Sequence, residues 1–268
     1  MGALTNIGAG VVALWIFVAL AAPVLAPFDP NALLSPFATP GAPGPDDGTF
    51  WLGTDHLGRD ILSRIIWGAR SVLTYAPVAA FCAYVLGVTM GLAAGYFKGW
   101  VDAGLSFVSN AVLAFPVLVL YILVITTIGA SALNIVLAVT FASAPGIMRI
   151  VRSLVLDLRN RGYVAAAETR GEALWWILFV EILPNARGPL IVDACLRLGY
   201  VIITIGVLGF LGLGLPPPDP DWGGMINESR ALTLAFPHMT LFPCLAISSL
   251  VLGLNLMADG LRKGEVRS

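Results

Sequence analysis

Histidine and cysteine are the side chains from which catalytic or metal chemistry is most readily built, and this sequence is poor in both. The two histidines, His56 and His238, lie in separate parts of the chain, without an H-E-x-x-H pair or any other ligand spacing. Cys82, Cys195 and Cys244 sit in apolar runs without paired spacing, as small buried thiols do. The sequence therefore predicts no metal site, no disulfide and no enzymatic activity on this chain.

A nucleotide site is not encoded either. The phosphate-binding pattern G-x-x-x-x-G-K-[ST] does not occur in the sequence. The glycines of "GLGL", residues 212–215, belong to an apolar segment and follow no strand. We therefore expect no cofactor on this chain.

One polar segment, "RGYVAAAETRGEALWWILFVEILPNARGP" (residues 161–189), interrupts an otherwise apolar sequence. It predicts a short helix from Tyr163 to about Arg170, a break at Gly171, and a second helix that ends before Pro184. The alanines of the first helix give it a smooth, narrow face that fits a groove. Two interpretations stay open: a solvated amphipathic connector, or a docking element for a soluble partner.

The second predicted helix of this segment is too apolar for a loop in water. We expect Trp175, Trp176, Ile177 and Phe179 to pack it against the ends of neighbouring helices.

A second segment, "WLGTDHLGRDILSRIIWGARSVL" (residues 51–73), predicts a turn followed by an amphipathic helix. Asp60 and Arg64 have the i,i+4 spacing of an ion pair. An apolar stripe accompanies them, formed by Ile61, Leu62, Ile65 and Ile66. We expect an interfacial helix that braces the bundle. Contact with an external substrate-delivery protein is the alternative.

The amino-acid composition indicates the environment in which the chain is folded. Of the 268 residues, 58% are hydrophobic and 12% are charged, whereas soluble domains have about 25% charged residues. Lipid is the environment in which so much apolar surface is stable. The net charge of −1 gives no basic field for nucleic acid.

Six apolar runs are long enough to cross a membrane, which takes roughly 20 residues. Several contain proline or glycine, which membrane helices tolerate and often place at close helix contacts, as we expect for Gly87 and Gly91. The runs cover residues 4–26, 72–96, 102–128, 131–150, 190–214 and 237–259.

Basic residues mark the cytoplasmic side of a membrane protein. Ten of the 15 lie in one set of connections and four in the other, with Arg197 inside a run. This distribution predicts that both termini are cytoplasmic. It divides the chain into a first transmembrane helix (1–26), an extracytoplasmic loop with the interfacial helix (27–71), a five-helix core (72–260) with a cytoplasmic loop (150–189), and a cytoplasmic tail (261–268). A cleavable signal pattern is absent.

Polar residues inside the apolar runs are functional candidates. Asp193 and Arg197, at i,i+4, pair with each other or line a solute path. Asn110 and Asn255 join helices or line the same path.

The polar segment resembles the cytoplasmic loop of the permease subunits of ABC importers, with its Glu-Ala-Ala, three residues, Gly, and a later Leu-Pro. Here the corresponding residues are Ala165, Ala166, Ala167, Gly171, Leu183 and Pro184. Ala165 stands where the family has Glu, so either the contact of that carboxylate is missing here or Glu168 supplies a substitute one turn on. The resemblance implies that this loop inserts into a groove on an ATP-hydrolysing subunit and carries its motion to the membrane helices.

Residues 51–73 resemble the Gly-Thr-Asp-x-x-Gly-Arg-Asp-x-x-Ser-Arg signature of the C-type permeases of the dipeptide/oligopeptide/nickel branch. The matching residues are Gly53, Thr54, Asp55, Gly58, Arg59, Asp60, Ser63 and Arg64. A third run, "LGFLGLGLPPPDPDWGGMI" (208–226), resembles the end of the family's fifth helix and the following loop. The resemblance extends from about residue 50 to the C-terminus. Family members commonly have a longer basic leader before the first helix, so an upstream start and a shortened subunit are both open alternatives.

The resemblance implies an all-α membrane protein of the type I ABC importer permease fold, with six transmembrane helices, in a prokaryotic cytoplasmic membrane. The implied partners are a second permease, two ATP-binding cassette subunits that hold ATP and Mg, an extracytoplasmic substrate-binding protein and lipid. The expected cargo is di- or oligopeptides. Nickel or another metal chelate, a small glycan or an opine are alternatives, and an ATPase-independent secondary transporter is a more remote one.

Overall fold

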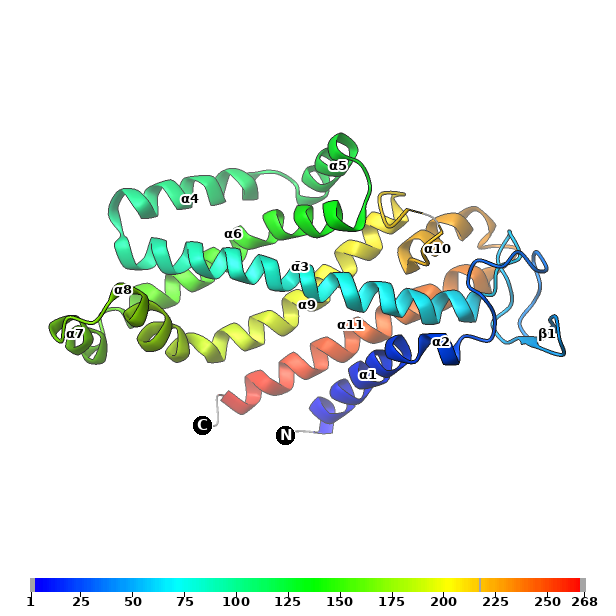
Figure 1. Cartoon of the computed structure of the whole chain (residues 1–268), viewed down its shortest axis with the longest axis horizontal. Coiled ribbons are helices and arrows are strands. Elements are labelled where there is room, and N and C mark those ends of the chain that lie inside the picture. The colour runs from blue at the N-terminus through cyan, green and yellow to red at the C-terminus, as the bar shows by residue number, and fades with distance from the viewer. Residues whose placement is uncertain (1–2, 217, 266–268) are drawn as a thin grey trace.

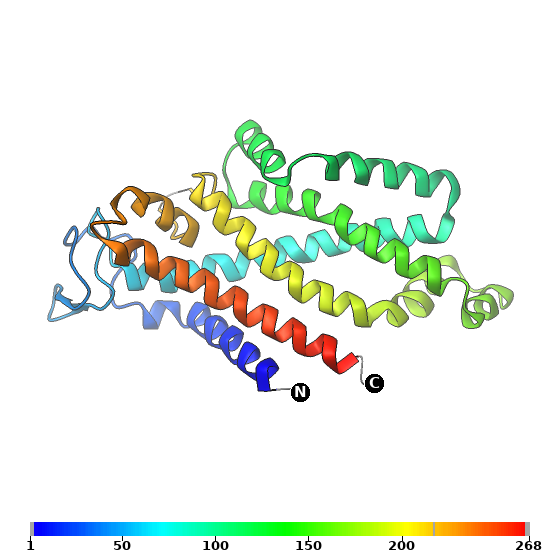
Figure 2. The same ribbon diagram turned by 180° about the vertical axis from the view of Figure 1, so that it is seen from behind.

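The computed structural model describes residues 3–216 and 218–265. Helices that run lengthwise form the body of this part of the chain (Figures 1 and 2). They are α1 (Ala3–Leu20), α3 (Ile61–Phe97), α6 (Ala132–Leu158), α9 (Arg187–Phe210) and α11 (Pro237–Glu265). Helices α3 and α6 form the most extensive pair, and α1 lies against α11 (Figure 1).

The apolar runs of the sequence all form helices, but their lengths differ from the prediction. Within the described residues, four helical stretches are long and apolar enough to cross a membrane: Ile61–Phe97, Ala132–Leu158, Leu174–Phe210 and Pro237–Arg262. Helix α1 is a shorter apolar helix, and α2 (Ala22–Leu25) follows it directly.

The third predicted span, residues 102–128, is not one straight helix. It consists of α4 (Gly99–Ala114) and α5 (Val117–Ile128), which meet at an angle of 90° and count as a fifth span when taken together. The bend falls at Pro116, which precedes the first residue of α5. Proline lacks the N–H that a continuous helix would need there, and its ring disfavours helical backbone at Phe115, which is extended.

Closely spaced glycines bring α3 and α6 together. A Cβ added to Gly87, Gly91 or Gly95 would lie 2.6, 2.5 and 2.7 Å from side-chain atoms of α6. The atoms in contact belong to Ile147, Val151 and Val155. The predicted close helix contact at Gly87 and Gly91 is therefore confirmed, and it holds backbone against backbone along the C-terminal half of both helices.

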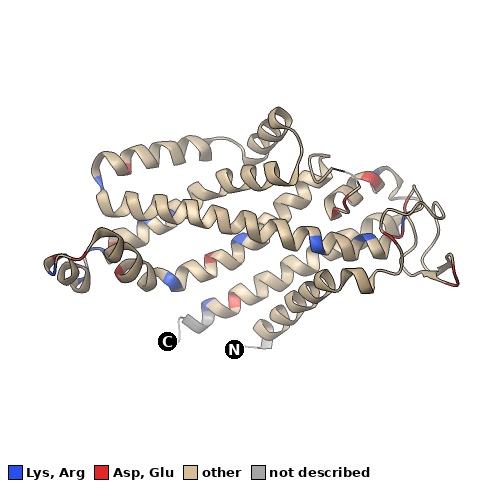
Figure 3. Ribbon diagram, viewed as in Figure 1, with Lys and Arg blue, Asp and Glu red and all other residues tan. Residues whose placement is uncertain are grey.

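At the end opposite α7 lie the irregular segments (Figure 1). The loop before α3 includes a two-stranded antiparallel pair, β1 (Ala42–Pro43) and β2 (Thr49–Phe50). The loop before α11 folds into α10 (Trp222–Ser229) and the 3-10 turn η3 (Arg230–Leu232). Charged residues gather mainly at the two ends, with few along the middle of the helices (Figure 3).

Candidate functional site

Helix α7 (Gly162–Thr169), the first of the two predicted helices in residues 161–189, forms one tip of the molecule (Figure 1). As labels of position, we call this tip the inner tip, the buried apolar cluster beside it the inner core, and the opposite end of the molecule the outer end. Val164 and Ala167 are fully buried in the inner core, together with residues of α3 and α6. Ala165 and Ala166, on the other side of the helix, are exposed. Packing on one side thus holds a small-residue face toward solvent on the other.

The predicted break at Gly171 is present. Its φ is +75°, a left-handed conformation that glycine adopts without a Cβ penalty, and no atom lies within 4 Å of the position of a Cβ. The Gly171 N–H donates to the Glu168 carbonyl at 3.0 Å, and the Glu172 N–H donates to the Ala167 carbonyl at 3.2 Å. These bonds end α7 in the manner of a left-handed helix cap.

Glu168 forms a hydrogen bond with another residue of the chain. Its carboxylate accepts a hydrogen bond from the Tyr96 hydroxyl at 2.9 Å, although Glu168 itself is exposed. This bond connects α7 to the inner end of α3, and Arg159 stacks over the same tyrosine ring at 5.3 Å. Glu168 therefore has a positioning contact within the molecule, one turn after Ala165.

The prediction that the second helix ends before Pro184 is wrong. Helix α8 (Leu174–Trp176) continues through a π turn, η1 (Ile177–Ile182), and a 3-10 turn, η2 (Leu183–Ala186), directly into α9. Pro184 lies in the first turn of η2, where its missing N–H leaves no bond unmade. Leu183 is half-buried against the inner core. The whole stretch Leu174–Phe210 is one helical rod of 37 residues.

The apolar residues of this rod only partly follow the prediction. Ile177 is buried, but Trp175, Trp176 and Phe179 are 60%, 37% and 46% exposed. The buried side is formed by Ile177, Leu178 and Ile182, so the predicted packing of the three aromatic rings is wrong. They form an apolar surface next to α7.

At the outer end, the signature residues shape the loop before α3. Thr54 donates its hydroxyl to the Ser35 carbonyl at 2.5 Å and accepts the Ala38 N–H at 2.8 Å. Gly53 and Gly58 have φ of +78° and +86°, and a Cβ on either would strike the backbone of residues 34–38. These three residues thus secure the loop to itself.

The predicted Asp60–Arg64 ion pair does not form. The Asp60 carboxylate caps α3, accepting the backbone N–H of Ser63 at 2.8 Å and its hydroxyl at 2.7 Å. The backbone N–H of Ser63, in the first turn of α3, lies closer to the Asp60 carboxylate than the Arg64 side chain does, so Asp60 caps the helix instead of pairing with Arg64. The Ser63 hydroxyl also accepts the Phe28 N–H at 3.0 Å. Burial raises the pKa of Asp60, while the Ser63 bonds oppose that shift.

The predicted interfacial helix is not separate from the second span. Residues 61–71 are the first turns of the continuous helix α3, and Ile61, Ile65 and Ile66 are buried. Arg64 is buried too, with 3% of its side chain exposed. Because both faces of this stretch are covered, it belongs to the body of the bundle.

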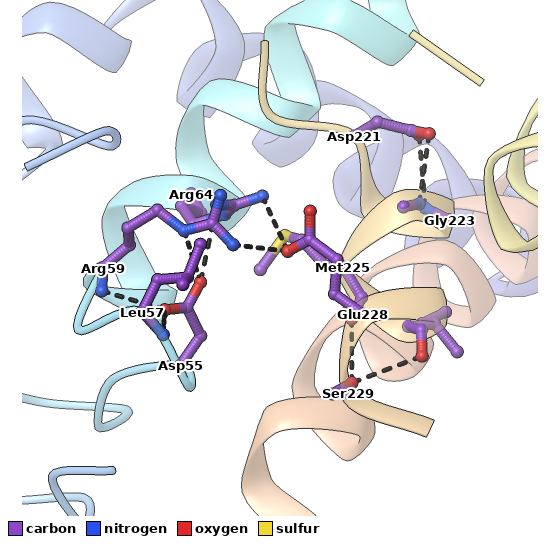
Figure 4. A network of polar contacts seen from close by, with 11 residues as sticks. Asp55, Leu57, Arg59, Arg64, Asp221, Gly223, Met225, Glu228 and Ser229 are labelled. Atoms are coloured by element: carbon purple, nitrogen blue, oxygen red, sulfur yellow. Dashed lines mark hydrogen bonds and ion pairs between the residues drawn. The ribbon is translucent and has the colours of Figure 1, made fainter. Parts of the chain in front are cut away.

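Four charged residues form the centre of the outer end (Figure 4). Arg59 pairs with Asp55 at 2.6 Å and with Glu228 of α10 at 2.5 Å. Arg64 approaches the same two carboxylates, each at 3.5 Å. Two cations and two anions alternate, so the buried charges of Asp55, Arg59 and Arg64 are compensated together with Glu228, the exposed member of the group. We call these four residues the outer ion cluster.

Asp55, His56 and Glu228 offer ligand atoms within 4.8 Å of one another, the arrangement from which a metal site could be built. Both carboxylates, however, already face Arg59 and Arg64. A divalent cation would have to enter beside two guanidinium groups. The donor set therefore does not fit a metal in this arrangement.

Helix α10 is anchored by Asp221 and Trp222. The Asp221 carboxylate caps the helix, accepting the N–H groups of Gly223 at 3.2 Å and Gly224 at 3.1 Å (Figure 4). Burial raises the pKa of Asp221 to about 6, against the two backbone bonds. The Trp222 ring is fully buried, and its N–H donates to the Ile65 carbonyl of α3 at 2.9 Å.

Polar residues within the bundle form local pairs. The predicted Asp193–Arg197 pair is present at 2.7 Å, and Tyr84 of α3 donates its hydroxyl to Asp193. Asn110 accepts a hydrogen bond from Arg149 at 2.7 Å and thereby joins α4 to α6. Sequence reasoning missed the partners Glu228, Tyr96, Tyr84 and Arg149, because each contacts a residue far away in the sequence and has no local signal.

Residues 87–264 match the family described as binding-protein-dependent transport system inner membrane component. The chain is 42% identical over 212 residues to the glutathione transport system permease protein GsiD of Pectobacterium atrosepticum, covering 79% of this chain and 70% of that protein. It is 37% identical over 250 residues to the dipeptide transport system permease protein DppC of Haemophilus influenzae, covering 91% of this chain and 84% of that protein.

Solved structures share the fold. One, the MetNI methionine ABC transporter in inward-facing conformations, matches with a TM-score of 0.62 and 17% identity over 76% of this chain and 97% of that chain. Another, an amino acid ABC transporter with histidines, matches with a TM-score of 0.58 and 12% identity over 76% of this chain and 94% of that chain. Fold, family match and relatives agree: this chain belongs to the inner membrane components of binding-protein-dependent transport systems, as a permease of the ABC importer type.

Proposed function

We propose that this chain is one of two permease subunits that together form the path of an ATP-driven peptide importer. ATP hydrolysis would take place on separate ATP-binding cassette subunits, which carry the ATP and Mg and dock on α7. An extracytoplasmic binding protein would deliver the solute to the end that holds the outer ion cluster.

The observation that carries this proposal is the construction of the inner tip. Ala165 and Ala166 face solvent, while Val164 and Ala167 anchor the same helix in the inner core. The exposed Trp175 and Phe179 lie on the rod that follows, which continues without a break into α9. A partner seated on this tip is therefore mechanically connected to a membrane-spanning helix.

The proposed orientation follows the same assignment. Docking to a soluble ATPase puts α7 in the cytoplasm, and both chain termini are expected there by the distribution of basic residues. The loops before α3 and α11 then face the binding protein. Dipeptide is the first cargo to test, because relatives of this chain are named for dipeptide and glutathione transport. Nickel or other chelates, small glycans and opines are the alternatives.

Affinity purification of the tagged chain from its native membrane tests the proposal, with the co-purifying subunits identified by mass spectrometry. We expect the wild type to bring an ATP-binding subunit and a second permease. Ala166→Arg puts a long cation on the exposed face of α7 and should lose the ATP-binding subunit while keeping the permease. Asn160→Arg is the matched control, because Asn160 is exposed at the same end but lies outside α7, and both partners should remain.

Purification of the chain alone, or as a homo-oligomer unaffected by Ala166→Arg, would contradict the proposal and favour a self-contained transporter. In proteoliposomes, the reassembled complex should take up a labelled dipeptide only with ATP and the binding protein present.

A further inference from the structure

A polar cavity of about 350 Å³ lies between α4 and α6, away from both ends already described. Helix α6 contributes Met148, Arg149 and Arg152, and α4 contributes Ser106, Ser109 and Asn110. A cavity of this kind is unexpected in helices that belong to membrane spans, because ionisable groups there are costly unless they serve a partner or a path.

The two arginines of the cavity differ in their partners. Arg152 is neutralised by Asp102, with its Nε and Nη2 each 2.5 Å from a carboxylate oxygen. Arg149 has no carboxylate partner among the described residues, and its one side-chain bond is the donation to the Asn110 carbonyl oxygen at 2.7 Å. The cavity therefore carries one uncompensated positive charge.

The groups left free in the cavity are hydrogen-bond donors. Arg149 uses one guanidinium nitrogen on Asn110, and the Asn110 amide NH₂ has no partner among the described residues. Ser106 is occupied by Asp102 at 3.0 Å and Ser109 by the Met148 sulfur at 3.2 Å. A guanidinium beside an amide NH₂ can give a carboxylate two parallel hydrogen bonds, one of them charge-assisted.

Arg149 and Asn110 are both exposed, so their free donors are accessible from the open side of the cavity. The cavity is lined by residues of α4 and α6. One turn before Arg149, Gly146 of α6 approaches α9, since a Cβ there would be 3.2 Å from the Arg197 guanidinium.

We propose that Arg149 and Asn110 form a subsite for the carboxylate of a transported solute, such as the C-terminal carboxylate of a short peptide. This inference rests on the proposed function and adds the class of group that the path recognises. Arg149 supplies the positive charge, and Asn110 orients the solute carboxylate. The Arg152 guanidinium is paired with Asp102 and therefore does not compete for that carboxylate.

Equilibrium binding to the assembled permease–ATPase complex, in nanodiscs of zwitterionic lipid and without the binding protein, tests the subsite. The probes are labelled Ala-Ala and its C-terminal amide, which lacks the negative charge. We expect the wild type to bind the free acid at least about 10-fold more tightly than the amide, the size of one charge-assisted bond. Arg149→Gln should abolish this preference, and Arg149→Lys should keep part of it. Arg262→Gln removes a charge at the exposed end of α11 and should change nothing.

Equal binding of acid and amide by the wild type would overturn the subsite, as would a preference that survives Arg149→Gln. An anionic lipid that eliminates the preference when added to the nanodiscs would identify lipid as the occupant and also overturn it. ATP-driven uptake of Ala-Ala in proteoliposomes with the binding protein distinguishes failure of the subsite from failure of the proposed function. If uptake is normal but the preference is absent, the subsite alone fails; if neither compound is ever taken up, the proposed function fails and the subsite with it.

Discussion

Trp222 of α10 lies directly on Gly68 of α3. A Cβ at Gly68 would be 2.6 Å from Cδ1 and 2.7 Å from Nε1 of the indole, which is also bonded to the Ile65 carbonyl and packs edge-on against Trp15 of α1 at 4.9 Å. Two segments that the sequence presents as separate signatures thus form one contact. The missing side chain of Gly68 is what admits the ring.

Gly68→Ala should lower the free energy of unfolding by about 1–3 kcal/mol, because a methyl group would have to displace a fully buried indole. Unfolding of the purified protein in mixed micelles, followed by tryptophan fluorescence, measures the change. The double variant with Trp222→Leu should recover part of the loss. Additive effects of the two substitutions would show that the ring and the glycine do not interact.

Gly91→Ala tests the contact between α3 and α6. The added methyl group would overlap Val151, so we expect a loss of about 1–3 kcal/mol. Gly104→Ala is the matched control, since no atom lies within 4 Å of that position in the interior of α4. It should stabilise the protein by about 0.5–1 kcal/mol through helix propensity. Similar destabilisation by both substitutions would argue against close α3–α6 packing.

Asp55→Asn tests the outer ion cluster. It leaves the two buried guanidinium groups of Arg59 and Arg64 with Glu228 as their remaining carboxylate in the cluster, and we expect a loss of about 3 kcal/mol. Asp157→Asn is the control. It breaks the exposed i,i+4 pair with Arg161, whose side chain is 58% exposed, and should cost less than about 0.5 kcal/mol. Equal effects would mean that the cluster is as weak as a surface pair.

Asp221 should make stability depend on pH on the acidic side. Its pKa rises from 3.8 to about 6 because burial disfavours the carboxylate, so the folded state binds the proton more tightly than the unfolded state. Stability is then highest below about pH 4 for this group, and it falls as the pH rises to about 6, by roughly 3 kcal/mol in total. Unfolding measured from pH 4 to 8 should show this fall in the wild type and a flatter profile in Asp221→Asn. Identical profiles would contradict the assignment.

Gly171→Ala should lower the free energy of unfolding only slightly, and it tests whether the conformation of residue 171 affects docking. The site is open, so the cost is that of placing a Cβ at positive φ, about 1 kcal/mol. Gly171→Asn should cost less, since asparagine adopts this conformation more readily. Affinity for the ATP-binding subunit, measured by titration of the purified partner, should fall in the same order. Equal affinity of the wild type, Gly171→Ala and Gly171→Asn for the ATP-binding subunit would show that the backbone conformation at residue 171 does not affect docking.

Sequence patterns correctly predicted features that depend on interactions between residues close together in the sequence. The break at Gly171 and the Asp193–Arg197 pair depend on backbone freedom or helical spacing within a few residues. The contact of Gly91 with Val151 joins two helices, but its signal, a glycine inside an apolar run, is local. The family resemblance added the fold. The predicted Asp60–Arg64 pair failed because two local options competed, and helix capping won over the ion pair.

Other features were not predictable because their cause lies elsewhere in the chain. Glu228 is 169 residues from Arg59, and nothing in its own surroundings signals the contact. Pro184 looked like a helix end, but the 3-10 turn places it where its missing N–H is harmless. The 90° bend at Pro116 depends on the orientation of α5, which a hydropathy pattern does not record.

The rod Leu174–Phe210 has a joint of mixed pitch. Its first ten residues after α8 pass from a π turn to a 3-10 turn, so the backbone bonds there span five residues and then three before the regular α9 ladder begins. An α-helix rotates about 100° for each residue, so moving one residue across this joint would swing every side chain of α9 about its axis. Such a one-residue shift would let α9 present a different set of residues to its neighbours without changing its place in the bundle.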